Sequence, residues 1–159
     1  MDADIHTMEQ LFTICQQNRS KLKDFLTTLD KEILFQIPEG FNNNIWWNVA
    51  HTVVTEQLLI YKLSGLEMNI SDTLVAKYRK GTFPEENPSE AEFEQVLELL
   101  TQLPAQTLKD YKAGKFKDFK TYPTSFGVTL NSVEDAINFN LFHEGMHFGN
   151  ILALKRAVK

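Results

Sequence analysis

Apolar side chains recur every three or four residues in four segments of this 159-residue chain, and that period strongly limits how it can fold. The segments cover about 4–29, 45–63, 89–111 and 133 to near the C-terminus. A period near 3.6 residues places one face of a helix against a core. No segment alternates between polar and apolar residues as a half-buried strand does. The sequence therefore predicts an all-α protein, a four-helix bundle.

Local signals predict where the later helices begin. Ser89, with Glu92 three residues later, forms a capping-box pattern. Asn131 or Ser132 can cap the last helix. Residues 66–88 lack strong periodicity, so we expect them to form a long crossover connection of the bundle. We expect loops at residues 30–44 and 121–130, which contain proline, glycine and asparagine turn signals.

Two residues interrupt the helical pattern. Arg19 occupies an apolar position of the first segment. We expect its aliphatic stem to lie over the core while its charged head reaches water. Pro104 lies inside the third segment, and we expect it to end or kink that helix near Leu103.

Composition favours one domain over residues 1–159 and excludes some partners. A net charge of −5 provides no general basic field for nucleic acid or an anionic membrane. Five lysines alternate with aromatic residues at 109–120, which we interpret as a solvated connector. Cys15 is the single cysteine, so no internal disulfide can form. Because the N-terminal residues do not resemble a signal peptide and no apolar run is of membrane length, we expect a cytoplasmic protein.

The strongest chemical signal is a group of histidines. His143 and His147 are four residues apart, so a helix places them on one face. His51 lies in the second helical segment on a stripe shared with Trp47 and Val54. One buried histidine is best explained by a hydrogen bond, but two on one face with a third on another buried helix favour a metal site. All-nitrogen ligation suits zinc, nickel, copper or iron.

Residues His143 to His147 also match the H-E-x-x-H pattern of zinc peptidases, in which the glutamate is the general base. Two observations disfavour that interpretation. Residues 148–159 contain no histidine, aspartate or glutamate that could be the third ligand. Glu144 also lies beside the face of the helix that carries the two histidines, not on it.

Neighbouring residues of the last helix leave alternatives open. Asn140 and Asn150 either hydrogen-bond the imidazoles and fix their tautomers or face a solvated cleft. Gly145 and Gly149 lie on the opposite side of the helix. They allow close approach by another helix, either within the chain or from a second copy in a homodimer.

These motifs resemble the DinB/YfiT-like family. The residues that carry the resemblance are W-W-N-V-A-H at 46–51, H-E-G-M-H-F-G-N at 143–150, and G-T-F-P at 81–84 followed by Pro88 and Ser89. Many members have a glutamine near the position of Asn150. The resemblance implies a four-helix bundle with nickel, zinc or a similar divalent ion on His51, His143 and His147.

Some members of that family resemble thiol transferases that use bacillithiol, mycothiol or glutathione. The resemblance therefore implies a metal-dependent enzyme, a thiol S-transferase or a hydrolase, with a small-molecule substrate. An open coordination position can acidify water or bind a thiolate. Tyr61 and Glu144 are candidate proton handlers. The alternative is a non-catalytic bundle, dimeric or not, that binds metal incidentally or not at all.

Overall fold

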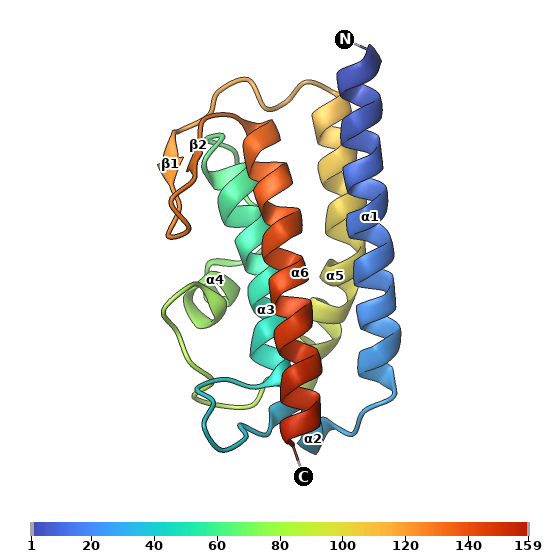
Figure 1. The fold of residues 1–159 in the computed structure, drawn as a ribbon, viewed down its shortest axis with the longest axis vertical. Coiled ribbons are helices and arrows are strands. Elements are labelled where there is room, and N and C mark those ends of the chain that lie inside the picture. Colours follow the sequence, from blue (N-terminus) through green and yellow to red (C-terminus); the bar gives the residue numbers. More distant parts are fainter. Residues whose placement is uncertain (1, 159) are drawn as a thin grey trace.

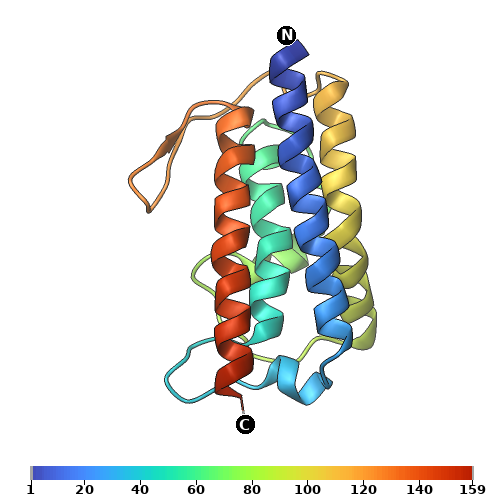
Figure 2. The same ribbon diagram turned by 45° about the vertical axis from the view of Figure 1, so that its right-hand side comes forward.

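The computed structural model describes residues 2–158, with side chains described from residue 6 onward. Four long helices lie side by side (Figures 1 and 2): α1 (Asp2–Thr27), α3 (Ile45–Glu56), α5 (Glu90–Lys112) and α6 (Val133–Ala157). Helix α1 packs mainly against α5, and α3 packs mainly against α6. The predicted all-α four-helix bundle is confirmed. None of the helices in the described part of the chain has enough length and apolar character to cross a membrane.

Helix α3 is the central element of the bundle. Asn44 caps it by accepting a hydrogen bond from Trp47 N at 2.7 Å, and residues 45–54 are all buried. A helix that is buried on every side must have neighbours on every side. At Gln57 it continues as the π-helical segment η1 (Gln57–Lys62), so the helix predicted over 45–63 changes hydrogen-bond register near its end.

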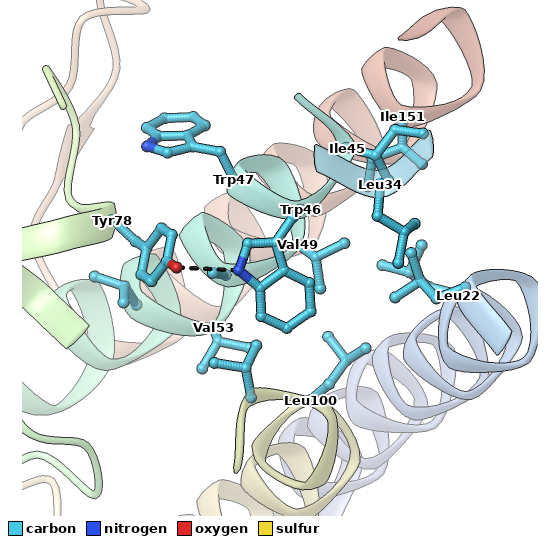
Figure 3. Close-up of a cluster of buried hydrophobic side chains, with 14 of the residues drawn as sticks. Leu22, Leu34, Ile45, Trp46, Trp47, Val49, Val53, Tyr78, Leu100 and Ile151 are labelled. Carbon is cyan, nitrogen blue, oxygen red and sulfur yellow. Dashed lines mark hydrogen bonds between the residues drawn. The ribbon is translucent and has the colours of Figure 1, made fainter. Parts of the chain in front are cut away.

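The two consecutive tryptophans at the start of α3 face different environments. Trp46 enters the main apolar core (Figure 3), where it stacks on Phe93 with ring centroids 4.6 Å apart. Its Nε1 donates to Tyr78 Oη at 3.0 Å, so its one polar atom has a partner. Trp47 lies on the other side, over the histidines, with its ring 4.5 Å from that of His51. Helix α3 therefore contributes both to the core and to the site.

The crossover from α3 to α5 is confirmed, but it contains a short helix, α4 (Asp72–Tyr78). Ser71 caps α4 through Leu74 N at 3.2 Å, and α4 packs on α3. The predicted loop at 30–44 likewise contains α2 (Lys31–Phe35). Both expectations of plain loop were wrong there, because such short helices span too few turns to show a periodic pattern.

Residues 121–130 were expected to be a loop, but they form a small antiparallel hairpin. Strand β1 (Tyr122–Pro123) pairs with β2 (Thr129–Leu130), with Tyr122 opposite Leu130. Two-residue strands are too short to show alternation in the sequence. The hairpin and α4 both lie on the side of α3 and α6 that faces away from α1 and α5 (Figure 1).

Both predicted helix starts are confirmed in part. Ser89 accepts from Glu92 N at 3.2 Å, and Ser132, not Asn131, caps α6 through Asp135 N at 3.2 Å. The carboxylate of Glu92 accepts instead from Tyr78 Oη at 2.6 Å. The first half of the capping box is therefore present, and the glutamate side chain ties α5 to α4.

Pro104 does not end α5, which runs without interruption from Glu90 to Lys112. A proline has no N–H for the carbonyl four residues earlier, so Leu100 O loses its helical partner. Arg19 Nη1 donates to that carbonyl at 3.4 Å, and Gln16 Nε2 donates to Thr101 O at 3.0 Å. Side chains of α1 thus supply hydrogen-bond donors close to the carbonyl of α5 that lacks its helical N–H partner.

Candidate metal centre

Three histidines meet where α3 packs against α6. His51 comes from α3, and His143 and His147 come from consecutive turns of α6. All three are buried, and one ring nitrogen of each lies within 4.8 Å of the others. The three residues singled out in the sequence are therefore brought together by the fold.

Hydrogen bonds define the tautomers of two of these rings. His51 Nδ1 lies 2.6 Å from the backbone oxygen of Tyr78, and His147 Nδ1 lies 2.7 Å from Asn48 Oδ1. A carbonyl oxygen only accepts, so each Nδ1 must carry the proton. The lone pair of each Nε2 is then directed away from these partners; that of His51 can accept from the Thr55 hydroxyl at 3.2 Å, and a metal ion would take the place of this contact.

Asn48 is oriented by its own contacts. Its Nδ2 donates to Asn44 O at 2.8 Å and to Asn43 Oδ1 at 3.0 Å. Those two bonds leave Oδ1 to face His147. The residue therefore holds a histidine of α6 from the first turn of α3.

His143 completes the group in a different way. Its Nε2 lies 3.1 Å from His147 Nε2, whereas its Nδ1 is buried and has no hydrogen-bond partner among the side chains that the structure describes, those of residues 6–158. Because His147 Nε2 has no proton, the two nitrogens can share one proton or one cation. Three neutral imidazole nitrogens in this arrangement fit a divalent transition metal.

The environment keeps these imidazoles neutral. Burial lowers the pKa of His143 to about 3, assisted by the charges of His147 and His51. Burial and then the charge of His51 lower the pKa of His147 to about 4. The pKa of His51 is also lowered by burial, although its hydrogen bond to Tyr78 opposes the change. Unprotonated rings are the form that binds metal.

A cavity of about 650 Å³ opens onto the three histidines. Trp47 and Phe139 form walls beside the rings, and Thr55 Oγ1 lies 3.2 Å from His51 Nε2. The other lining residues come mainly from η1, the segment just after α4, the hairpin and α6. They are Asn43, Leu58, Leu59, Lys62, Leu63, Lys80, Gly81, Lys120, Tyr122, Thr124, Ser125, Phe126 and Met146. A space of this size holds a small molecule.

Glu144 lies outside this cavity. Its carboxylate accepts from Arg19 at 2.6 and 3.1 Å and from Asn140 Nδ2 at 2.7 Å. The Cys15 thiol donates to it at 3.5 Å, and burial raises the pKa of that thiol. The Glu144 carboxylate is thus engaged in hydrogen bonds on the side of α6 away from the histidines. This agrees with the expectation that the chain is not a zinc peptidase.

The candidate proton handlers are not placed for that role. Tyr61 Oη donates to Asp110 at 2.7 Å, and neither Tyr61 nor Glu144 lines the cavity. Their side chains face other helices. The expectation that they handle protons at the site was wrong. The position of a residue on its helix does not show which neighbouring side chain it will contact.

Arg19 was expected to reach water, and that expectation was wrong. The residue is 1% exposed, and its Nη2 lies 2.7 Å from Glu56 Oε2 and 2.6 Å from Glu144 Oε1. Two carboxylates from α3 and α6 offset the cost of burying the guanidinium. The arginine therefore joins α1 to both helices that carry the histidines.

The two asparagines of α6 do not contact the histidines. Asn140 donates to Glu144, and Asn150 is exposed. Asn48 and the Tyr78 carbonyl hold the rings instead, and sequence reasoning did not assign them that role. Asn48 could have been noticed as a polar residue in a buried apolar run, but a backbone carbonyl in a crossover has no sequence signal.

Gly145 and Gly149 do not serve internal helix packing. Both are exposed, and a Cβ at either would meet nothing within 4 Å. The interpretation as an internal close approach is therefore wrong. A contact with a second copy of the chain stays a prediction.

Comparison with known families agrees with this site. A search of curated proteins found no match. The family model of the DinB superfamily matches residues 15–151, a range that includes all three histidines, the whole of α3 and α5, and parts of α1 and α6. On that match, which covers most of the sequence, the chain belongs to the DinB superfamily.

Proposed function

We propose that this protein is a divalent-metal-dependent enzyme, with nickel or zinc held by His51, His143 and His147. The observation that carries the proposal is the pair of acceptors on Nδ1 of His51 and His147, which leaves the Nε2 lone pairs available. Metal-binding histidines characteristically donate their other ring N–H to such an acceptor. The Nε2 atoms of His143 and His147 lie 3.1 Å apart, so a single cation can be within reach of both.

We propose that the chemistry is thiol S-transfer or hydrolysis of a small molecule. A divalent ion on three neutral imidazoles keeps an open coordination position, where it acidifies a bound water or thiol. Asn48 and the Tyr78 carbonyl hold the ligand tautomers, and the Trp47 ring shields one side of His51 from water. The Thr55 hydroxyl can hydrogen-bond a polar group beside His51 Nε2. A low-molecular-weight thiol would be one substrate of the transferase, in the cytoplasm.

Metal content tests the site. Protein purified without chelators should carry about one equivalent of nickel or zinc, or take it up when offered. His51→Ala should lower metal affinity strongly, because it removes one of three ligands. His6→Ala is the matched control, since His6 is exposed on α1 and outside the cavity. Equal affinity in both variants would contradict the three-histidine site.

A separate assay tests whether the protein is an enzyme. Metal-loaded protein should be incubated with low-molecular-weight thiols and an electrophile, and in parallel with ester and amide substrates. Turnover that His51→Ala removes and His6→Ala retains would support an enzyme. Metal binding without turnover in any of these assays favours a non-catalytic bundle. The exposed face of α6 around Gly145 and Gly149 is the observation that favours dimerisation in that case.

A further inference from the structure

The cavity over the histidines has a charge opposite to that of the whole chain. Three lysines line it, Lys62, Lys80 and Lys120, and no aspartate or glutamate of the described residues does. The chain as a whole has a net charge of −5. None of the three lysines forms an ion pair with the side chains of residues 6–158. The cavity therefore presents unpaired positive charge to whatever enters it.

The lysines lie at two ends of the cavity. Lys80 is at the histidine end, since it follows Tyr78, whose carbonyl accepts from His51. Lys62 is eleven positions after His51 on the continuous helix α3–η1, or roughly 15 Å along its axis. Lys120 is held at that same end, because its backbone N donates to Leu63 O at 2.7 Å. The backbones of Lys62 and Lys120 thus lie at the same end of the cavity, away from the histidines.

Apolar side chains fill the wall between these ends. They come from η1 and the residue after it, the hairpin and α6, and they are Leu58, Leu59, Leu63, Phe126, Phe139 and Met146. Phe126 packs edge to face against Phe139 at 6.0 Å, so the hairpin tip is in contact with α6. Phe126 nevertheless remains 50% exposed. An apolar ligand body would cover this surface and remove it from water.

We infer that the cavity binds an organic anion with an apolar body, oriented with its anionic group between Lys62 and Lys120 and its reactive group towards the histidines. The anionic group is a carboxylate, sulfonate or phosphate ester, and the body spans on the order of 10 Å. The inference takes from the proposed function only that the histidines are the reactive end. Lys62 and Lys120 are exposed, so a neutral molecule of the same shape would leave both hydrated and would only lack their attraction, whereas a cationic one would be repelled by them.

A matched pair of probes tests this inference by calorimetry, 4-phenylbutane-1-sulfonate and 4-phenylbutan-1-ol. A sulfonate is a weak ligand for divalent ions, so it reports on the lysines and not on the metal. With metal-loaded and with chelator-treated protein, the sulfonate should bind on the order of fivefold more tightly than the alcohol. The preference should fall as salt is added.

The double variant Lys62→Gln/Lys120→Gln should remove the preference and leave the affinity for the alcohol unchanged. Lys21→Gln/Lys117→Gln is the control, since it changes net charge equally at exposed lysines outside the cavity. That variant should keep the preference. Unchanged thermal unfolding of both variants would show that they are folded.

Several results would overturn the inference. They are equal affinity for both probes, no binding of either at millimolar concentration, or a preference that survives in Lys62→Gln/Lys120→Gln. A preference that is lost only in Lys80→Gln would place the anion at the histidine end and reverse the orientation. Anion selectivity without any metal uptake would contradict the proposed function alone. Metal uptake without selectivity would contradict this inference alone.

Discussion

Asn48 Oδ1 lies 2.7 Å from Nδ1 of His147 and joins the first turn of α3 to the middle of α6. The two residues are 99 positions apart in the chain. This bond sets the tautomer of His147 and holds its ring in place, and a hydrogen-bonded asparagine network holds Asn48. The orientation of a candidate metal ligand thus depends on how two helices are packed.

Removing that acceptor should weaken metal binding. We expect Asn48→Leu to lower the affinity for nickel or zinc by about 10- to 100-fold, because the His147 ring loses the partner that fixes its tautomer. Asn48→Asp retains an acceptor for Nδ1–H and should keep more of the affinity. Competition with a chromophoric chelator measures both. An affinity for Asn48→Leu equal to that of the unmodified protein would contradict this role.

Metal binding should also stabilise the fold. Metal at 100 times its Kd adds about 2.7 kcal/mol to the free energy of unfolding if it binds only the folded state. For a chain of this size that corresponds to a rise in Tm of roughly 5–10 °C. Differential scanning calorimetry with and without metal measures the shift. The rise should vanish in His147→Ala and persist in His6→Ala, and a shift of the same size in both variants would point to binding elsewhere.

Breaking the buried ion-pair group should be costly. Arg19→Met leaves Glu56 and Glu144 buried without their cation, so we expect a loss of about 3–5 kcal/mol in the free energy of unfolding. Urea denaturation followed by circular dichroism gives this value. Lys21→Met on the exposed side of α1 is the control and should change stability by less than about 0.5 kcal/mol. A small effect of Arg19→Met would mean that the two carboxylates are protonated or hydrated.

Two glycines of α6 offer substitutions that should stabilise the protein. Gly145→Ala and Gly149→Ala should each stabilise the monomer by about 1 kcal/mol, because alanine favours helix and its Cβ meets no neighbour. Urea denaturation measures the gain. If a second copy packs on this face, the same substitutions should weaken association, which sedimentation velocity would detect. If these variants are less stable than the unmodified protein and all of them are monomeric, the conclusion that a Cβ at Gly145 and Gly149 meets no neighbour would be wrong.

The sequence by itself determined the elements whose signals are local. Helical periodicity predicted the four long helices, Ser89 was predicted as the cap of α5, and the cap of α6 was narrowed to Asn131 or Ser132, of which Ser132 is the one observed. It also placed His143 and His147 on one face and His51 on an inward stripe. These properties depend on residues within one or two helical turns, so they are present in the chain before it folds.

Only the tertiary structure decided which buried polar groups would meet. Arg19 reaches Glu144 across 125 positions, and His51 finds a backbone oxygen in the crossover. A charged or polar side chain must find a partner when it is buried, but the sequence does not say which distant partner packing will supply. The same is true of the cavity, where lysines from η1, the crossover and the segment before the hairpin come to line the same space as the histidines only after the helices have packed.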